Sequence, residues 1–184
     1  MIIEDDLKLD YSDVLIRPKR STLTSRFDVE LERTYTFYHS GKKWTGVPII
    51  ASNMDTTGTF EMHKTLSRSG MVTCIARHYN KSGKLWNEAD NKNKLCVMSG
   101  ISNPEISEII GVINTFPDIA FVGLDVANGY TINFVDTIKR LRNELSNTTI
   151  IAGNVVTADM TAEVILAGAD IVKVGIGGGS VCTT

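Results

Sequence analysis

Six short apolar segments, separated by segments with a helical pattern, constrain the fold of this chain more than any other feature. They lie at residues 47–51, 71–76, 94–98, 119–125, 149–153 and 170–174. Near-continuous apolar strands are typical of a parallel sheet whose faces are both covered. Strands that alternate with helices place the chain in the α/β class. The sequence therefore predicts six consecutive β/α units.

The segments between these strands carry the usual start signals of helices. Ser102-Asn-Pro-Glu105 combines a capping box with proline at the beginning of a helix. Apolar residues then recur at helical spacing at Ile106, Ile109 and Ile113. Thr157 is placed to cap a later helix. Each of these patterns predicts a helix with one apolar face toward the sheet.

Repeated β/α units of this length fit a (β/α)8 TIM barrel, here an incomplete barrel of about six units spanning residues 47–184. The last two units are then expected from a second chain or from the rest of a longer protein. A doubly wound open sheet is the alternative, because periodicity alone does not separate the two. Residues 1–46 are polar and irregular, and we predict an N-terminal extension with a small hairpin built from residues 29–31 and 34–38.

Composition and charge exclude several classes of partner. The chain has 19 basic and 21 acidic residues without a basic tract, so we expect no nucleic-acid partner. Its start is acidic and no apolar run reaches the roughly 20 residues of a membrane span, so we expect no membrane partner. Three cysteines without regular spacing argue against a disulfide framework and favour a cytoplasmic setting. Cys74 and Cys96 fall within predicted strands and are expected to be buried.

Polar residues follow most of the predicted strands. In parallel β/α folds the carboxyl ends of the strands meet at one edge, and reactive groups gather there. Asp125 could alternatively cap the helix that follows it. His39 and His63 belong to no such group. The polar residues in question are Asn53 and Asp55 after the first strand, Arg77 and His78 after the second, Asp125 and Asn128 after the fourth and Asn154 after the fifth.

The sixth strand runs into a glycine-rich segment that ends in Cys182, Thr183 and Thr184. Glycines permit a tight loop whose N–H groups can face an anion or whose C=O groups can face a cation. A cysteine held in such a loop becomes a nucleophile when nearby dipoles or charge favour its thiolate. The alternative is an ordinary turn with a packed cysteine.

Several long motifs resemble those of the IMP dehydrogenase/GMP reductase family. They include Asn53-Met-Asp-Thr56, Asp125-Val-Ala-Asn-Gly-Tyr130, Ala152-Gly-Asn-Val-Val-Thr157 and Gly179-Ser-Val-Cys-Thr-Thr184. The resemblance runs nearly end to end and favours the reductase branch, because the chain has no room for the regulatory domain that dehydrogenases usually carry after the second unit. It implies a TIM barrel that converts GMP to IMP and ammonia with NADPH.

The resemblance also implies roles for individual residues. Cys182 would attack C2 of the purine and form a covalent thioimidate, and Thr184 would relay a proton. A potassium ion would bind the backbone carbonyls of Gly177, Gly179 and Cys182. Substrate contacts would come from Asn53, Met54, Asp125, Asn154 and Ser180. Cofactor contacts would come from Ser25, Arg26, Arg77, Asp125, Val126, Ala127, Ile176 and Gly177.

The expected partners are GMP and IMP, together with further copies of the chain, since the family is typically tetrameric, or a complementing C-terminal chain. An oxidoreductase resembling IMP dehydrogenase is one alternative. A non-catalytic half-barrel that needs a second chain is another.

Overall fold

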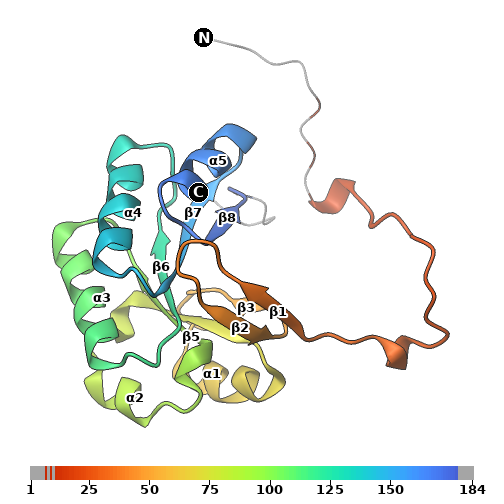
Figure 1. Cartoon of the computed structure of the whole chain (residues 1–184), viewed down its shortest axis with the longest axis horizontal. Helices are drawn as coiled ribbons and strands as arrows, with labels where there is room; N and C mark the ends of the chain where they lie inside the picture. Colours follow the sequence, from red (N-terminus) through yellow and green to blue (C-terminus); the bar gives the residue numbers. More distant parts are fainter. Residues whose placement is uncertain (1–6, 8, 10, 178–184) are drawn as a thin grey trace.

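Six parallel strands form one curled sheet in which neighbours follow the order of the chain (Figure 1). The computed structural model describes residues 7, 9 and 11–177. The strand order β3-β4-β5-β6-β7-β8 has no reversal, whereas a doubly wound sheet reverses at its switch point. The prediction of an incomplete TIM barrel of six units is therefore confirmed, and the open-sheet alternative is wrong. The strands are β3 (Ile50–Ala51), β4 (Val72–Ile75), β5 (Leu95–Ser99), β6 (Phe121–Asp125), β7 (Thr149–Val155) and β8 (Ile171–Val174).

Five α-helices connect these strands along the outer face of the sheet (Figure 1). They are α1 (Phe60–Leu66), α2 (Gly83–Glu88), α3 (Asn103–Thr115), α4 (Ile132–Glu144) and α5 (Ala158–Leu166). The predicted caps are confirmed: Glu105 accepts hydrogen bonds from Ser102, and Thr157 accepts one from the Met160 N–H. Thr131 caps α4, so Asp125 is not a helix cap. None of the helices in the described part of the chain is long and apolar enough to cross a bilayer.

The larger core lies between the sheet and the helices. Ile106 and Ile109 of α3 and Phe134 of α4 are fully buried there, against outward-facing strand residues such as Leu124 and Ile150. Alternation along each strand sends the intervening side chains to the opposite, inner face. The two apolar faces explain why each strand reads as a continuous apolar run.

A second, smaller cluster fills the inner face of the curled sheet. It contains Cys74 of β4, Cys96 and Met98 of β5, and Phe121 of β6. Both cysteines are free and buried, which confirms the prediction made for them. Gly123 faces the same space, and a Cβ there would collide with the Met98 side chain. Glycine at position 123 therefore leaves the space that the Met98 side chain occupies.

The hairpin of the structure differs from the predicted one. Residues 29–31 form no strand, and β1 (Arg33–Thr36) instead pairs antiparallel with β2 (Lys43–Gly46). Trp44 of β2 is buried against Phe121, with ring centroids 5.9 Å apart. Burial of this large ring on the inner face of the sheet stabilises the pairing of β1 with residues 43–46. The tripeptide 29–31 buries no comparable side chain.

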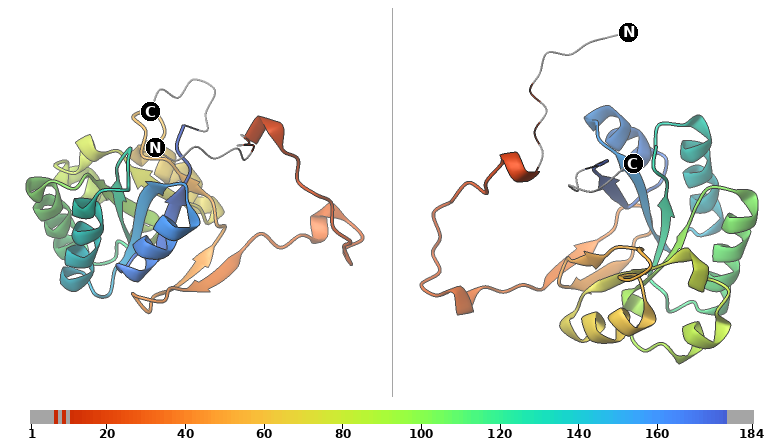
Figure 2. Two further views of the ribbon diagram at one scale, coloured as in Figure 1. Left: turned by 90° about the horizontal axis from the view of Figure 1, so that it is seen from above. Right: turned by 180° about the vertical axis from the view of Figure 1, so that it is seen from behind.

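The segment that precedes the hairpin is an extended arm. Residues 12–32 contain no buried side chain, and Leu15 and Ile16 are almost fully exposed. The arm runs outward from β1 and away from the sheet (Figure 2). Its local structure is limited to η1 (Tyr11–Asp13) and η2 (Arg26–Asp28), two of the short 3-10 helices; the others are η3 (Ser67–Ser69), η4 (Arg77–Tyr79) and η5 (Lys92–Lys94).

Candidate active site

The carboxyl ends of strands β3 to β8 form one edge of the curled sheet, which we call the barrel mouth. Asp125, the last residue of β6, lies there and is about 29% exposed in its side chain. Its Oδ2 accepts a hydrogen bond of 2.9 Å from Nδ2 of Asn53, in the loop after β3. Its Oδ1 accepts one from Nζ of Lys173 on β8. The mouth therefore joins residues that are far apart in the chain around one carboxylate.

The Asp125 carboxyl is held in its ionised form. Burial by itself would raise its pKa, but the hydrogen bonds from Lys173 and Asn53 and the charges of Lys173 and Arg77 outweigh it and hold that pKa below its ordinary value. An ionised carboxylate accepts hydrogen bonds at both oxygens and has about four acceptor positions. Among the described residues, Lys173 and Asn53 occupy two of these positions, so positions remain for donors of a ligand.

Asn154 of β7 anchors the start of the glycine-rich segment. Its Nδ2 donates to the Gly175 carbonyl at 2.8 Å, and its own carbonyl accepts from the Gly129 N–H at 3.0 Å. Gly175 and Gly177 have φ angles of +134° and +70°, in the region that favours glycine. Asn154 thus ties the segment after β8 to the loop after β6.

Arg77 begins η4, directly after β4. Its Nη1 contacts Oε1 of Glu105 at 2.9 Å, and its side chain is 53% exposed. Hydrogen bonding from Ser102, followed by the Arg77 charge, holds the pKa of Glu105 below its ordinary value. Arg77 is therefore an accessible cation beside the mouth, oriented by the first turn of α3.

The structure brings together some of the predicted site residues and not others. Asn53, Asp125 and Asn154 converge at the mouth, and Met54, Arg77, Val126, Ala127, Ile176 and Gly177 lie in the segments that follow its strands. Ser25 and Arg26 lie on the extended arm, where Ser25 accepts a hydrogen bond from the Phe27 N–H. The arm that carries them extends away from the sheet (Figure 2). The remaining predicted residues, Gly179, Ser180, Cys182 and Thr184, lie outside the described residues.

Lys173 is the residue that sequence reasoning missed. It contacts the central carboxylate, yet none of the sequence motifs singled it out. A signal was present: Lys173 is the only charged residue in the strand Ile171–Val174. A charged side chain in an otherwise apolar strand usually has a partner when it is drawn from solvent, and the partner here is Asp125.

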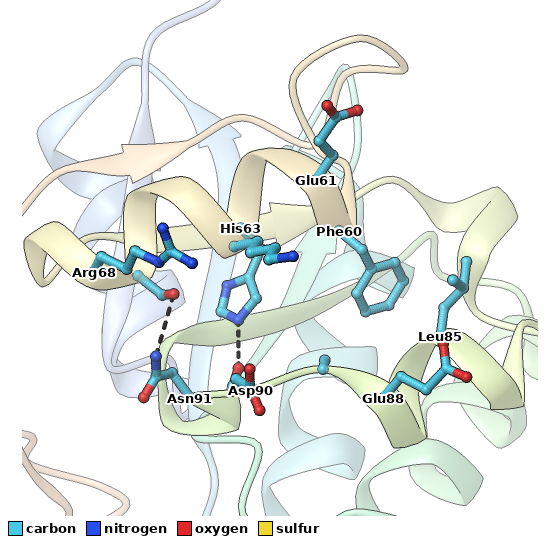
Figure 3. A pocket seen from close by; sticks show the side chains of 11 residues that line it. Phe60, Glu61, His63, Arg68, Leu85, Glu88, Asp90 and Asn91 are labelled. Carbon is cyan, nitrogen blue, oxygen red and sulfur yellow. Dashed lines mark hydrogen bonds between the residues drawn. The ribbon is translucent and has the colours of Figure 1, made fainter.

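A hollow lies on the outside of the sheet, between α1 and α2 (Figure 3). His63 lies on α1, and Figure 3 shows its ring directed toward the segment after α2, where its Nε2 donates a hydrogen bond of 2.7 Å to the Asp90 carbonyl. His63 is 2% exposed, and its Nδ1 is buried without a hydrogen-bond partner among the described residues. None of the residues that line this hollow belongs to the mouth. His63 is therefore a structural histidine in a neutral state.

His63 makes stability depend on pH. Burial lowers its pKa below the ordinary value of 6.5, so the unfolded chain binds a proton more readily than the folded one. The resulting stabilisation is complete above about pH 6.5 and is lost as the pH falls toward the lowered pKa. We expect the urea midpoint to fall between pH 7.5 and 5.5, and His63→Gln to reduce that fall. His78→Gln, at a half-exposed imidazole, is the control. Equal pH dependence in wild type and His63→Gln would contradict this assignment.

Comparisons with known proteins converge on one family. A family model described as IMP dehydrogenase / GMP reductase domain matches residues 8–184. A protein named GMP reductase from Klebsiella pneumoniae is 53% identical over 100% of this chain and 54% of its own length. Another from Caenorhabditis elegans is 52% identical over 99% of this chain and 52% of its own length. The crystal structure of inosine 5′-monophosphate dehydrogenase from Legionella pneumophila has a TM-score of 0.75 and 30% identity, covering 96% of this chain and 53% of that one. The chain thus spans about half the length of the relatives it matches.

Proposed function

This chain belongs to the IMP dehydrogenase / GMP reductase family, and from that premise we propose that it is the N-terminal part of a GMP reductase. The proposed reaction is the reductive deamination of GMP to IMP and ammonia with NADPH. One observation carries the proposal: an ionised carboxylate, Asp125, lies at the barrel mouth with Asn53 and Lys173 bonded to it. The two relatives with 53% and 52% sequence identity over nearly the whole of this chain are named GMP reductase.

The connection between β4 and β5 supports the reductase over the dehydrogenase. It contains only η4, the short helix α2 and η5. No inserted domain lies between β4 and β5. An oxidoreductase that oxidises IMP is the second candidate, supported by the structural likeness to the Legionella pneumophila dehydrogenase.

In the proposed mechanism, the Cys182 thiolate attacks C2 of the purine and forms a C–S bond. The 2-amino group takes up a proton through Thr184 and leaves as ammonia, which gives a thioimidate. After reduction at C2, the C–S bond breaks, and IMP and the thiolate are released. Asn154 holds Gly175, at the start of the segment that leads to Cys182, and Ser180 contacts the nucleotide phosphate. Asn53, Met54 and Asp125 line the purine pocket.

NADPH, when bound, supplies the hydride. The residues present fit such a group, because Asp125 retains free acceptor positions and Arg77 is an accessible cation close by. Val126, Ala127, Ile176 and Gly177 would form the backbone wall of the cofactor site. A potassium ion would bind the carbonyls of Gly177, Gly179 and Cys182, since carbonyl oxygens suit this cation. Gly177 has the φ of +70° that a sharply turning loop requires.

We further propose that residues 1–46 are an N-terminal extension with a small hairpin, which joins copies of the chain, and that residues 47–184 are the first six β/α units of the barrel, in a homo-oligomer that is a tetramer by family. The exposed arm supports this division, because Leu15 and Ile16 stay uncovered in a single chain. An arm that reaches a second copy would carry Ser25 and Arg26 to the mouth of that copy. The remaining two β/α units would come from a C-terminal part of the same protein or from a complementing chain.

The test is a completed barrel, made by joining this chain to the C-terminal residues of the Klebsiella pneumoniae relative that it does not cover. We expect GMP to cause loss of NADPH absorbance and release of ammonia. This chain alone is the control and is expected to be inactive, as a non-catalytic half-barrel would be. Oxidation of IMP with a nicotinamide cofactor, without activity toward GMP, would favour the dehydrogenase. Inactivity of a folded completed barrel toward both nucleotides would overturn the proposal.

A further inference from the structure

Lys173 reaches its partner across an intervening strand. It lies on β8, whereas Asp125 lies on β6, and β7 separates the two strands (Figure 1). Asp125 is in register with Gly153 of β7, and Gly153 is in register with Lys173. The three residues therefore form one rung across the sheet, with a charged residue at each end and a glycine between them.

The glycine is required for this crossing. A Cβ built on Gly153 would lie 2.5 Å from the Lys173 Cβ and 2.5 Å from the Lys173 carbonyl oxygen. Real Cβ atoms do not approach other atoms so closely, so no other residue fits without displacing β8. With glycine, the aliphatic part of the lysine passes over β7 and its ammonium group meets the carboxylate.

The carboxylate is fixed from two sides. Lys173 holds Oδ1 from β8, and Asn53 holds Oδ2 from the loop after β3, at 2.9 Å. Both charged side chains are close to 30% exposed, so this pair is neither free in solvent nor fully buried. Arg77 on η4 is the other cation that acts on Asp125. An unpaired carboxylate in this position would rotate toward solvent or take up a proton.

We propose that Lys173 is a positioning residue, which holds Asp125 ionised and in one orientation so that it can accept a hydrogen bond from the nicotinamide cofactor. The inference rests on the proposed function, in which Asp125 contacts that cofactor. Misplacing a contact by about 1 Å can cost about a hundredfold. Loss of Lys173 is therefore expected to weaken NADPH binding and to raise the KM for NADPH about tenfold to a hundredfold, with a smaller change in kcat.

The test compares Lys173→Met, which keeps the length without the charge, with Lys173→Arg, which restores a cation. The matched control is Lys139→Met, in an exposed pair with Asp136 on α4. Two readouts are used: the carbon-13 NMR titration of the Asp125 carboxyl in this chain, and the dissociation constant and KM of NADPH in the completed barrel. We expect Lys173→Met to raise the titration midpoint and weaken binding, Lys173→Arg to recover most of both, and the control to match wild type.

Two results overturn the inference: an unchanged carboxyl midpoint in Lys173→Met, or wild-type NADPH affinity in that variant. Failure of the proposed function is distinguishable from failure of this inference. A wild-type barrel that binds NADPH but does not oxidise it with GMP refutes the reductase function. In that case the NADPH dissociation constant and the NMR midpoint of Asp125 still test the role of Lys173. A wild-type barrel that binds no NADPH overturns both. If Lys173→Met does not fold, the same two readouts are compared between wild type and Lys173→Arg.

Discussion

Cys182→Ser in the completed barrel is expected to lower kcat for GMP at least about a thousandfold, because the hydroxyl is a far poorer nucleophile than the thiolate. NADPH affinity should change little, since the side chain acts on the substrate. The measurement is the loss of NADPH absorbance at saturating GMP, with trapping of the purine–enzyme adduct by mass spectrometry. Alkylation of wild type before GMP is added should reproduce the loss.

The control for this experiment is Cys74→Ala, at a buried thiol on the inner face of the sheet. It removes a cysteine without touching the mouth and should retain activity within a few-fold. The covalent mechanism is refuted if Cys182→Ser turns over at a rate within tenfold of wild type.

The second large effect concerns stability and centres on Asp170. This residue immediately precedes β8, and its side chain is fully buried. Oδ2 forms an ion pair of 2.6 Å with Nη2 of Arg142 on α4 and accepts a 3.1 Å hydrogen bond from the Ile150 N–H. Oδ1 accepts hydrogen bonds from the N–H groups of His39 and Ser40, in the turn of the hairpin. One carboxylate therefore ties the hairpin to α4, β7 and β8.

Asp170→Ala is expected to lower the free energy of unfolding by about 3–5 kcal/mol, the usual cost of removing one partner of a buried ion pair. The N–H groups of His39, Ser40 and Ile150 lose this acceptor together. The Arg142 guanidinium loses its charged partner and, among the described residues, keeps only backbone carbonyls as acceptors. Urea unfolding of this chain, followed by circular dichroism, measures the change.

The matched control is Asp136→Ala, which breaks the exposed Lys139–Asp136 pair and should cost at most about 1 kcal/mol. Similar losses in the two variants would show that burial and the shared hydrogen bonds of Asp170 do not contribute as argued.

The candidate site could be predicted in part. Asn53, Asp125 and Asn154 each follow or end an apolar strand, and parallel strands bring such positions to one edge. That reasoning needs only the order of strands and polar residues along the chain. It does not say which polar groups touch, so it placed Asn53 and Asp125 together without revealing their hydrogen bond. It also missed Lys173, because the pairing depends on the register of β6, β7 and β8.

Local patterns in the sequence determined the strands, the helices and their caps, since these depend on hydrogen bonds and side-chain periodicity within a few residues. Tertiary structure alone decided the hairpin partner of β1, the burial of His63 and the ion pair of Arg142 with Asp170. The members of these contacts lie apart in the chain, and their stabilisation comes from burial and from charges that meet only after folding. The same holds for the rung of Asp125, Gly153 and Lys173. The sequence predicts Asp125 as a site residue, but only the pairing of three strands brings Lys173 to it across Gly153.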